Sequence, residues 1–435
     1  MNTGLKKTLS PLLLWGLGVG YVISGMYFGW NLGLEKGGVF GMLAATALVI
    51  VMYVSFSFSY SELACAIPKA GGGFDYANRA LGKDLGFITG LAQIIEFVFA
   101  PPAIAIAIGS YLHLSFPQIP VIVAAVSIYL IFTAVNIYGV KAAATFELFV
   151  TVLAVLELLI FAGVTLPHFS TTAFKQNAMV NGWSGAFAAL PFAIWFFLGI
   201  EGVANVAEET KNPQKDILKG FGSAMFTLVV LCVIVFFAAV GVGGWEKIVY
   251  SADGSASDSP LPLAMGNVVS TDSWLYHMLI SIGLFGLVAS FHGLILASGR
   301  ATMEFGRVGY APKVLGRISS RFHTPHVALI INMGLGIIAL FTGKTGEIIT
   351  ISVFGALTLY IISMAAVLKL RQSEPELERP FKVPLYPVLP VLALVIGLIC
   401  LVAMSYFNQT LALLYFGVLA FCFLLFKILY QPDKA

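Results

Sequence analysis

The chain has little charge. Asp, Glu, Lys and Arg make up only 10% of its 435 residues, whereas hydrophobic residues make up 59% and the mean hydropathy is +0.93. A soluble protein of this length cannot bury so large an apolar fraction, because its surface must remain polar. The composition therefore excludes a soluble globular protein and indicates a chain whose solvent is mainly lipid.

Cysteine and catalytic motifs are also scarce. Cys65, Cys232, Cys400 and Cys422 lie in or at the end of apolar segments without paired loop spacing, which predicts small core residues rather than disulfides or metal ligands. The sequence has no phosphate-binding glycine loop followed by Lys, no metal-spaced His/Cys cluster and no nucleophile–base arrangement. We therefore expect no enzyme, no cofactor, no metal site and no nucleic-acid partner, the net charge of +3 reflecting membrane orientation.

Long apolar runs are what the chain has in abundance. Windows of roughly 19 residues on a transfer scale predict twelve transmembrane helices, so the expected fold class is an all-α polytopic membrane protein. The expected spans are 11–33, 39–62, 86–112, 119–138, 143–165, 186–206, 219–243, 274–298, 326–342, 346–369, 387–407 and 410–430.

Basic residues are unevenly distributed between the predicted loops. With the N-terminus inside, 20 of the 24 Lys and Arg residues fall on the cytoplasmic side, and only Lys36, Lys175, Lys247 and Lys344 fall outside. Short cytoplasmic loops of membrane proteins are enriched in Lys and Arg. We therefore expect a multi-pass protein of the cell (inner, cytoplasmic) membrane with both termini in the cytoplasm.

Two predicted spans carry glycines in their middle thirds. The first reads GLGVGYVISGMYFGWNLGL, and the sixth lies within PFAIWFFLGIEGVANVAEETKNPQ. They occupy corresponding positions when spans one to five are compared with spans six to ten. Paired glycine-interrupted helices indicate an inverted-repeat transporter with a site near the midplane, although any single glycine could serve helix packing alone.

Four ordered motifs carry a family resemblance: YSELACAIPKAGGGFDYANRALG, GIEGVANVAEETKNPQKDI, SGRATMEFGRVGYAPKVLGRISSRFHTPHVAL and ERPFKVPLYPVLP. Together they resemble the amino acid–polyamine–organocation (APC) superfamily of secondary transporters over essentially the whole chain. The resemblance implies a leucine-transporter-like fold with a 5+5 inverted repeat, discontinuous helices 1 and 6, and two peripheral helices. It divides the chain into a cytoplasmic N-terminus (1–10), a first repeat (11–165), a second repeat (166–370), and helices 11 and 12 with the C-terminus (371–435).

Within that superfamily, GYVISGMYFGWNLGL, APPAIAIAIGSYLH and FAIWFFLGIEGVANVAEETKNP are most similar to the ethanolamine permease branch. Where many amino acid permeases read Gly-Ser-Gly or similar in the first helix, this chain has Ser24-Gly25-Met26. The bulkier Met26 predicts a smaller or differently shaped pocket than a standard amino acid needs.

The expected substrate site lies at the two helix breaks. Unwound helix leaves backbone groups without partners, and in a membrane such backbone must line a cavity or be satisfied by protein or ligand. We expect N–H groups at Ser24, Gly25 and Met26 to bind a substrate oxygen. The carbonyls around Phe197 to Ile200, a stretch that includes Gly199, are expected to accept hydrogen bonds from an ammonium. The expected aromatic contacts to the cation are Trp195, Phe196 and Phe197.

Two carboxylates are candidates for binding the ammonium. Glu201 lies in the sixth-helix break, but a Gly-hydrophobic-Glu pattern is common across the superfamily, so a structural or gating role is an equal alternative. Glu96 lies eleven residues past Leu85, roughly 16 Å along the helix, where an ionisable residue is a functional candidate by default. A protonated, hydrogen-bonded packing role is its alternative.

The coupling candidates are Glu157, Ser290 and His292. Many proton-coupled relatives carry a Lys in the fifth helix. An ungapped alignment with these relatives from Gly139 onward places Ala154 at the position of this Lys, so the coupling lysine is absent. Glu157 could hold a proton or cation or face a polar seam, and His292 could titrate or act as a neutral donor. Ser290 is placed near the cation position of sodium-coupled relatives. Glu147, near Lys141, is expected to form a structural ion pair.

These observations favour uptake of ethanolamine, or a close small amine, by alternating access, coupled to protons or to exchange. The alternative is a proton-coupled amino acid or polyamine permease. A hypothesis of another class is a membrane nutrient sensor. The expected partners are therefore a small amine, a coupling ion (H⁺) and the lipid bilayer.

Overall fold

The computed structural model describes residues 7–139, 143–251, 253–342 and 344–429, and within these ranges the chain forms helices and no β-sheet. The helices are α1 (Pro11–Val22), α2 (Ser24–Tyr27), α3 (Leu32–Ala66), α4 (Gly73–Leu81), α5 (Lys83–Ser115), α6 (Val121–Tyr138), α7 (Ala143–Thr165), η1 (Leu166–His168), α8 (Thr171–Lys175), α9 (Gly182–Ala188), α10 (Leu190–Trp195), η2 (Ile200–Glu209), α11 (Pro213–Val240), α12 (Glu246–Val249), α13 (Pro260–Gly266), α14 (Trp274–Arg307), η3 (Lys313–Gly316), α15 (His326–Leu340), α16 (Thr345–Ser373), α17 (Val388–Phe407) and α18 (Gln409–Leu429).

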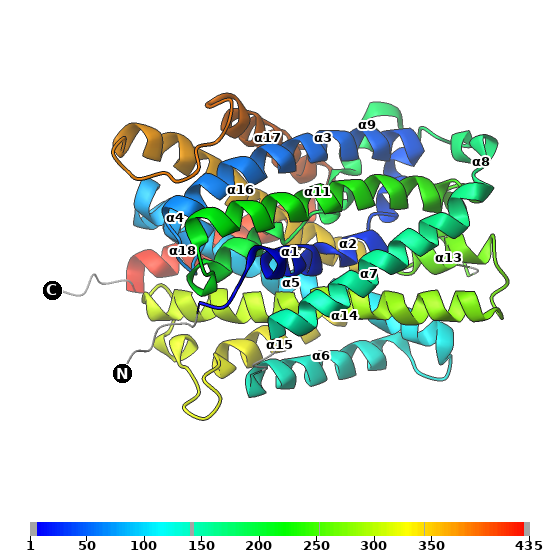
Figure 1. The fold of residues 1–435 in the computed structure, drawn as a ribbon, viewed down its shortest axis with the longest axis horizontal. Coiled ribbons are helices and arrows are strands. Elements are labelled where there is room, and N and C mark those ends of the chain that lie inside the picture. The colour runs from blue at the N-terminus through cyan, green and yellow to red at the C-terminus, as the bar shows by residue number, and fades with distance from the viewer. Residues whose placement is uncertain (1–6, 140–142, 252, 343, 430–435) are drawn as a thin grey trace.

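The predicted all-α membrane class is confirmed. Among the described residues, ten helical segments are long and apolar enough to cross a membrane, and α1 and α15 are shorter apolar helices. Each of the twelve predicted spans overlaps one of these segments. The long helices run side by side, with α4 at one end of the molecule, here called the α4 end, and α8 and α13 at the opposite, α13 end (Figure 1).

The first span is interrupted twice. α1 begins at Pro11 with Ser10 as its cap and ends at Val22; after Ile23, one helical turn forms α2. Phe28 is then extended and Gly29 has a φ of 86°, so the chain leaves the helix until Leu32. The expected unwinding over Ser24–Met26 is therefore displaced: these residues form a helical turn, and the interruptions flank it.

The sixth span is broken at the predicted place. α10 ends at Trp195, and the chain resumes as the 3₁₀ helix η2 at Ile200. Gly199 has a φ of 94°, a left-handed conformation that glycine adopts without steric cost. The break brings the carboxyl group of Glu201 to the start of η2, where it is fully buried.

Candidate functional site

The two helix breaks touch through their backbones. A Cβ built on Gly25 would lie 2.5 Å from the carbonyl oxygen of Trp195 and 3.1 Å from the Cα of Phe196. The indole Nε1 of Trp195 donates to the carbonyl of Phe28, at 3.1 Å. Glycine at position 25 therefore allows the interrupted parts of the first and sixth spans to meet in the protein centre.

A side chain from α14 replaces one hydrogen bond of the first span. The hydroxyl of Ser290 donates to the carbonyl of Gly20, at 2.6 Å, and accepts from the N–H of Ser24, at 3.0 Å. These two groups would bond to each other in a continuous helix. The Ser24 N–H, which we expected to bind substrate, is thus already satisfied by Ser290.

The carboxyl groups of Glu96 on α5 and Glu201 on η2 lie next to each other. Both residues are fully buried. The backbone N–H of Gly199 lies near the Glu96 carboxyl and that of Glu201 near its own carboxyl, but no described donor meets good hydrogen-bond geometry with either oxygen of Glu96 or with Oε1 of Glu201. Within the same described ranges, no Lys or Arg interacts electrostatically with either carboxyl. The structure therefore brings together two acidic side chains that the sequence analysis singled out separately.

Two tyrosines that the sequence analysis missed extend this pair. The hydroxyl of Tyr360 on α16 donates to Oε2 of Glu201, at 2.7 Å, and lies 3.3 Å from the hydroxyl of Tyr53 on α3. The ring centroids of Tyr53 and Phe197 lie 5.2 Å apart, so Phe197 contacts the tyrosine whose hydroxyl lies next to that of Tyr360. All three aromatic residues are buried.

Trp195 and Phe196 face the first-span break instead. The ring of Phe196 stacks on Trp30 with their centroids 5.4 Å apart, and the Trp30 indole donates to the carbonyl of Met26, at 3.1 Å. Met26 itself is fully buried. These contacts fix the shape of the break next to the carboxyl pair, and Gly199 forms the turn between Phe197 and Glu201.

The three coupling candidates lie on two helices, Glu157 on α7 and Ser290 and His292 on α14, and have different partners. The hydroxyl of Tyr27 donates to Oε2 of Glu157, at 2.6 Å. The side-chain amide nitrogen of Asn136 lies 3.0 Å from Nδ1 of His292, so this ring nitrogen acts as an acceptor. His292 is therefore hydrogen-bonded to α6, and its role in coupling stays a prediction.

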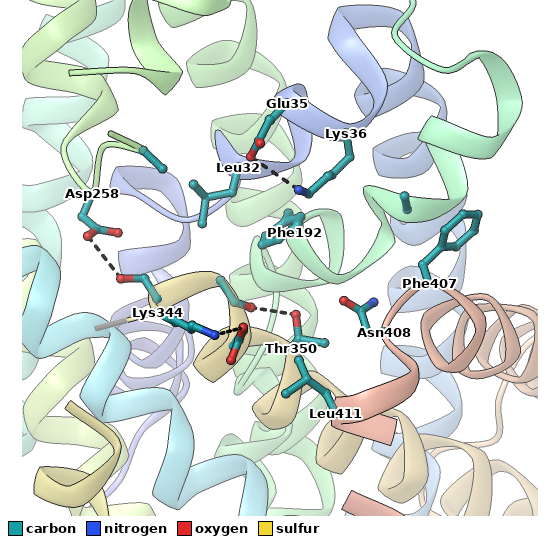
Figure 2. Close-up of a pocket in the computed structure, with 15 residues that line it drawn as sticks. Leu32, Glu35, Lys36, Phe192, Asp258, Lys344, Thr350, Phe407, Asn408 and Leu411 are labelled. Carbon is teal, nitrogen blue, oxygen red and sulfur yellow. Dashed lines mark hydrogen bonds and ion pairs between the residues drawn. The ribbon is translucent and has the colours of Figure 1, made fainter. Parts of the chain in front are cut away.

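A cavity of about 620 Å³ lies at the α13 end. Figure 2 shows its polar rim, where Lys36 pairs with Glu35 and Lys344 pairs with Glu347. Asp258 has no such basic partner among the described residues and instead accepts from the hydroxyl of Thr345, at 3.1 Å. Burial raises the pKa of the Asp258 carboxyl to about 6, against the smaller lowering effect of that hydrogen bond.

A second cavity, of about 670 Å³, lies at the α4 end. Tyr21 and His292 line it, together with Arg300 and Glu209, which form an ion pair at 2.8 Å. The protein that contains the carboxyl pair thus has a polar cavity at each end.

No group of three His, Cys, Asp or Glu side chains among the described residues could hold a metal ion.

Known proteins match this chain over nearly all of its length. It is 26% identical to the uncharacterized transporter R00093 of Rhizobium meliloti (strain 1021), over 99% of this chain and 94% of that one. It is 24% identical to the branched-chain amino acid permease BcaP of Bacillus subtilis (strain 168), over 90% and 86%. The crystal structure of a mutant manganese transporter of Eremococcus coleocola matches with a TM-score of 0.62 and 13% identity, covering 98% and 96%, which supports the fold alone.

The profile of the amino acid permease family matches residues 13–431. These relatives are permeases and transporters rather than enzymes, as expected from the missing catalytic motifs. The chain therefore belongs to the amino acid permease family, a family of multi-pass membrane transporters of small molecules.

Proposed function

We propose that this chain is a secondary transporter of a small organic cation with an ammonium group, and that ethanolamine is a substrate. The pair formed by Glu96 and Glu201 is the observation that carries this proposal. Two neighbouring carboxylates repel each other strongly when buried, and an ammonium placed between them would neutralise charge and donate to their free oxygens. Tyr360 and Phe197 then supply a hydroxyl and an aromatic face to the same site.

The first-span break supports a substrate that lacks a carboxylate. An amino acid would require backbone N–H donors for its carboxylate, but the N–H of Ser24 already bonds to Ser290. The buried side chain of Met26 takes up space at the same break, and the carboxyl pair would repel a substrate anion. Ethanolamine has the ammonium group without this anion.

A proton-coupled amino acid or polyamine permease is the second candidate. The family and the branched-chain amino acid permease of Bacillus subtilis favour it. In both cases we propose protons as the coupling ion, in a cell membrane and with both termini cytoplasmic. Glu157, Ser290 and His292 are the candidates for this coupling that follow from the sequence.

Ligand-dependent thermal stabilisation of the purified protein tests the substrate class, because a ligand of the native state raises the melting temperature by mass action. The panel is ethanolamine, putrescine, choline, lysine and leucine. We expect ethanolamine to stabilise the protein and leucine to have no effect. Stabilisation by leucine without any effect of ethanolamine would establish the amino acid alternative and reject our proposal.

Variants of the carboxyl pair test the site. We expect Glu96→Gln and Glu201→Gln each to weaken ethanolamine binding at least about tenfold, equivalent to about 1.4 kcal/mol. Glu374→Gln, at an exposed ion pair with Arg79, is the matched control and should bind as the wild type does. Wild-type affinity in both pair variants would remove these carboxyls from the site.

A further inference from the structure

The proposed substrate site does not use Glu147, a buried acidic residue on α7. Its side chain is 2% exposed, and its Oε1 has no hydrogen-bond donor among the described residues. Lys141, with which the sequence analysis paired it, lies outside the described residues. Glu147 is thus not a surface ion pair in the described part of the chain, but a carboxyl turned into the protein.

Glu147 faces the C-terminal end of α1. A Cβ built on Gly20 would lie 2.5 Å from Oε1 of Glu147 and 2.8 Å from Oγ1 of Thr151. A Cβ built on Gly293 of α14 would lie 3.7 Å from the same carboxyl oxygen. The carboxyl therefore lies where α1, α7 and α14 meet, at a place left open by two glycines.

Hydroxyl groups join the three helices around this carboxyl. Thr151 on α7 donates to the carbonyl of Gly16, at 3.1 Å, and Ser290 on α14 donates to the carbonyl of Gly20, at 2.6 Å. The Ser290 bond is the one that replaces the helical bond between Gly20 and Ser24. Glu147 therefore contacts α1 at the residue where its regular hydrogen bonding stops.

No described charged group pairs with Glu147. Tyr21 on α1 is its titratable neighbour, and the charged groups around Tyr21 besides Glu147 are Arg300 and Glu209, which pair with each other. On α14, His292 accepts from Asn136 through Nδ1. Of the other helices packed on α7, α13 has no charged residue, and the charged residues of α11 all lie in its first seven positions, at the α4 end: Lys215, Asp216 and Lys219.

We propose that Glu147 is the binding site of the coupling proton, and that α1 separates from α7 and α14 when this carboxyl ionises. The inference rests on the proposed function only in requiring that the chain transports a substrate with protons. A neutral carboxylic acid packs in this contact, whereas a carboxylate without a counter-ion is costly to bury and favours the entry of water. Ionisation would then weaken the contact of α1 at Gly20, next to the substrate break.

The proton balance is simple. On the proton-rich side, a hydronium ion gives its proton to the Glu147 carboxylate: one O–H bond of hydronium breaks, the O–H bond of the carboxyl forms, and α1 closes against α7. On the other side, water from the α4-end cavity, which Tyr21 lines, reaches the carboxyl. The carboxyl O–H bond breaks, the proton passes to this water to form hydronium, and α1 then separates from α7 and α14.

Proteoliposomes containing the full chain separate exchange from proton coupling. Exchange is measured as counterflow of labelled substrate at equal pH, and coupling as accumulation driven by a pH gradient, with a pH-sensitive dye inside. Glu147→Gln mimics the protonated state. We expect this variant to keep counterflow, whereas its gradient-driven accumulation should fall at least about tenfold below that of the wild type. Glu147→Asp should restore part of that accumulation, and Glu374→Gln, at the exposed ion pair with Arg79, should retain both activities.

The outcomes are distinguishable. Gradient-driven accumulation by Glu147→Gln at the wild-type level overturns the inference. So does a result in which Glu157→Gln loses this accumulation and Glu147→Gln does not. A wild-type protein that exchanges substrate without responding to the pH gradient overturns it as well. Loss of counterflow in Glu147→Gln and Glu147→Asp together shows a structural role and also overturns it. Failure of ethanolamine as a substrate contradicts the proposed function instead, and the Glu147 test then proceeds with the substrate that the stabilisation panel identifies.

Discussion

At the scale of single residues, Glu62 on α3 contacts two arginines. Both of its oxygens accept from Arg371, at 2.7 Å each, and Oε2 also accepts from the N–H of Val383, at 2.7 Å. Arg379 lies 3.3 Å from Oε1, and the side chains of Glu62 and Arg379 are only 3% and 4% exposed. This cluster fastens the segment after α16 to α3 at the α4 end.

We expect Glu62→Gln to lower the free energy of unfolding by about 3–5 kcal/mol, because Arg379 would stay buried without a compensating charge. The measurement is the melting temperature of the purified protein. Glu374→Gln breaks the exposed pair with Arg79 and should cost no more than about 1 kcal/mol. Equal, small shifts in the two variants would contradict a structural role for the Glu62 cluster.

The acidic residues show what the sequence can reveal at this scale. Glu96 and Glu201 were found because a carboxylate in an apolar run is conspicuous, but their mutual contact depends on helix packing. Tyr53 and Tyr360 could not be found, since a tyrosine in an apolar span carries no pattern, and the bond from Tyr360 to Glu201 crosses 159 residues. The expected partner of Glu147, Lys141, lies outside the described residues, and no pattern in the sequence indicates that this side chain turns toward a glycine of α1 and a glycine of α14.

At the scale of elements, long apolar runs predict the spans well, but they do not locate the breaks. The sixth-span break coincides with Gly199, whose positive φ has a direct sequence signal. The first-span interruption was misplaced because Ser290, 266 residues away, decides which backbone bond is replaced. A contact between distant helices therefore determined what local glycine content could not.

The meeting of the two breaks gives a prediction for Gly25. Gly25→Ala would place a methyl group 2.5 Å from the Trp195 carbonyl, and a backbone atom cannot move aside as a flexible side chain can. We expect the first and sixth spans to be forced apart, with a loss of stability of about 1–3 kcal/mol and at least a tenfold loss of transport. Melting temperature and uptake in proteoliposomes measure the two effects.

Gly222 on α11 is the matched control, because nothing lies within 4 Å of a Cβ built there. Gly222→Ala should leave transport unchanged and, in a regular helix, leave stability equal or slightly higher. If Gly25→Ala behaves in the same way, the contact between the two breaks has no functional importance.

At the scale of the whole molecule, the distribution of basic residues predicts which end faces the cytoplasm. Arg300, Arg371 and Arg379 lie at the α4 end, where they join the ion pairs with Glu209 and Glu62. The cytoplasmic leaflet is anionic and the positive-inside rule acts in the same direction. We therefore predict that the α4 end is cytoplasmic and that the α13-end cavity receives substrate from outside.

Single cysteines introduced at the two ends test this orientation in intact cells. Ser255 lies between α12 and α13 and Ser320 lies between η3 and α15, and both are exposed. Since Cys65, Cys232 and Cys400 are buried, only Cys422 must be replaced by Ser to prevent labelling of the native cysteines. A membrane-impermeant maleimide should label Ser255→Cys in intact cells and Ser320→Cys only in inverted vesicles, because the charged loops around Ser320 are retained inside. The reverse labelling pattern would show that the protein has the opposite orientation in the membrane, with the α4-end cavity facing the outside.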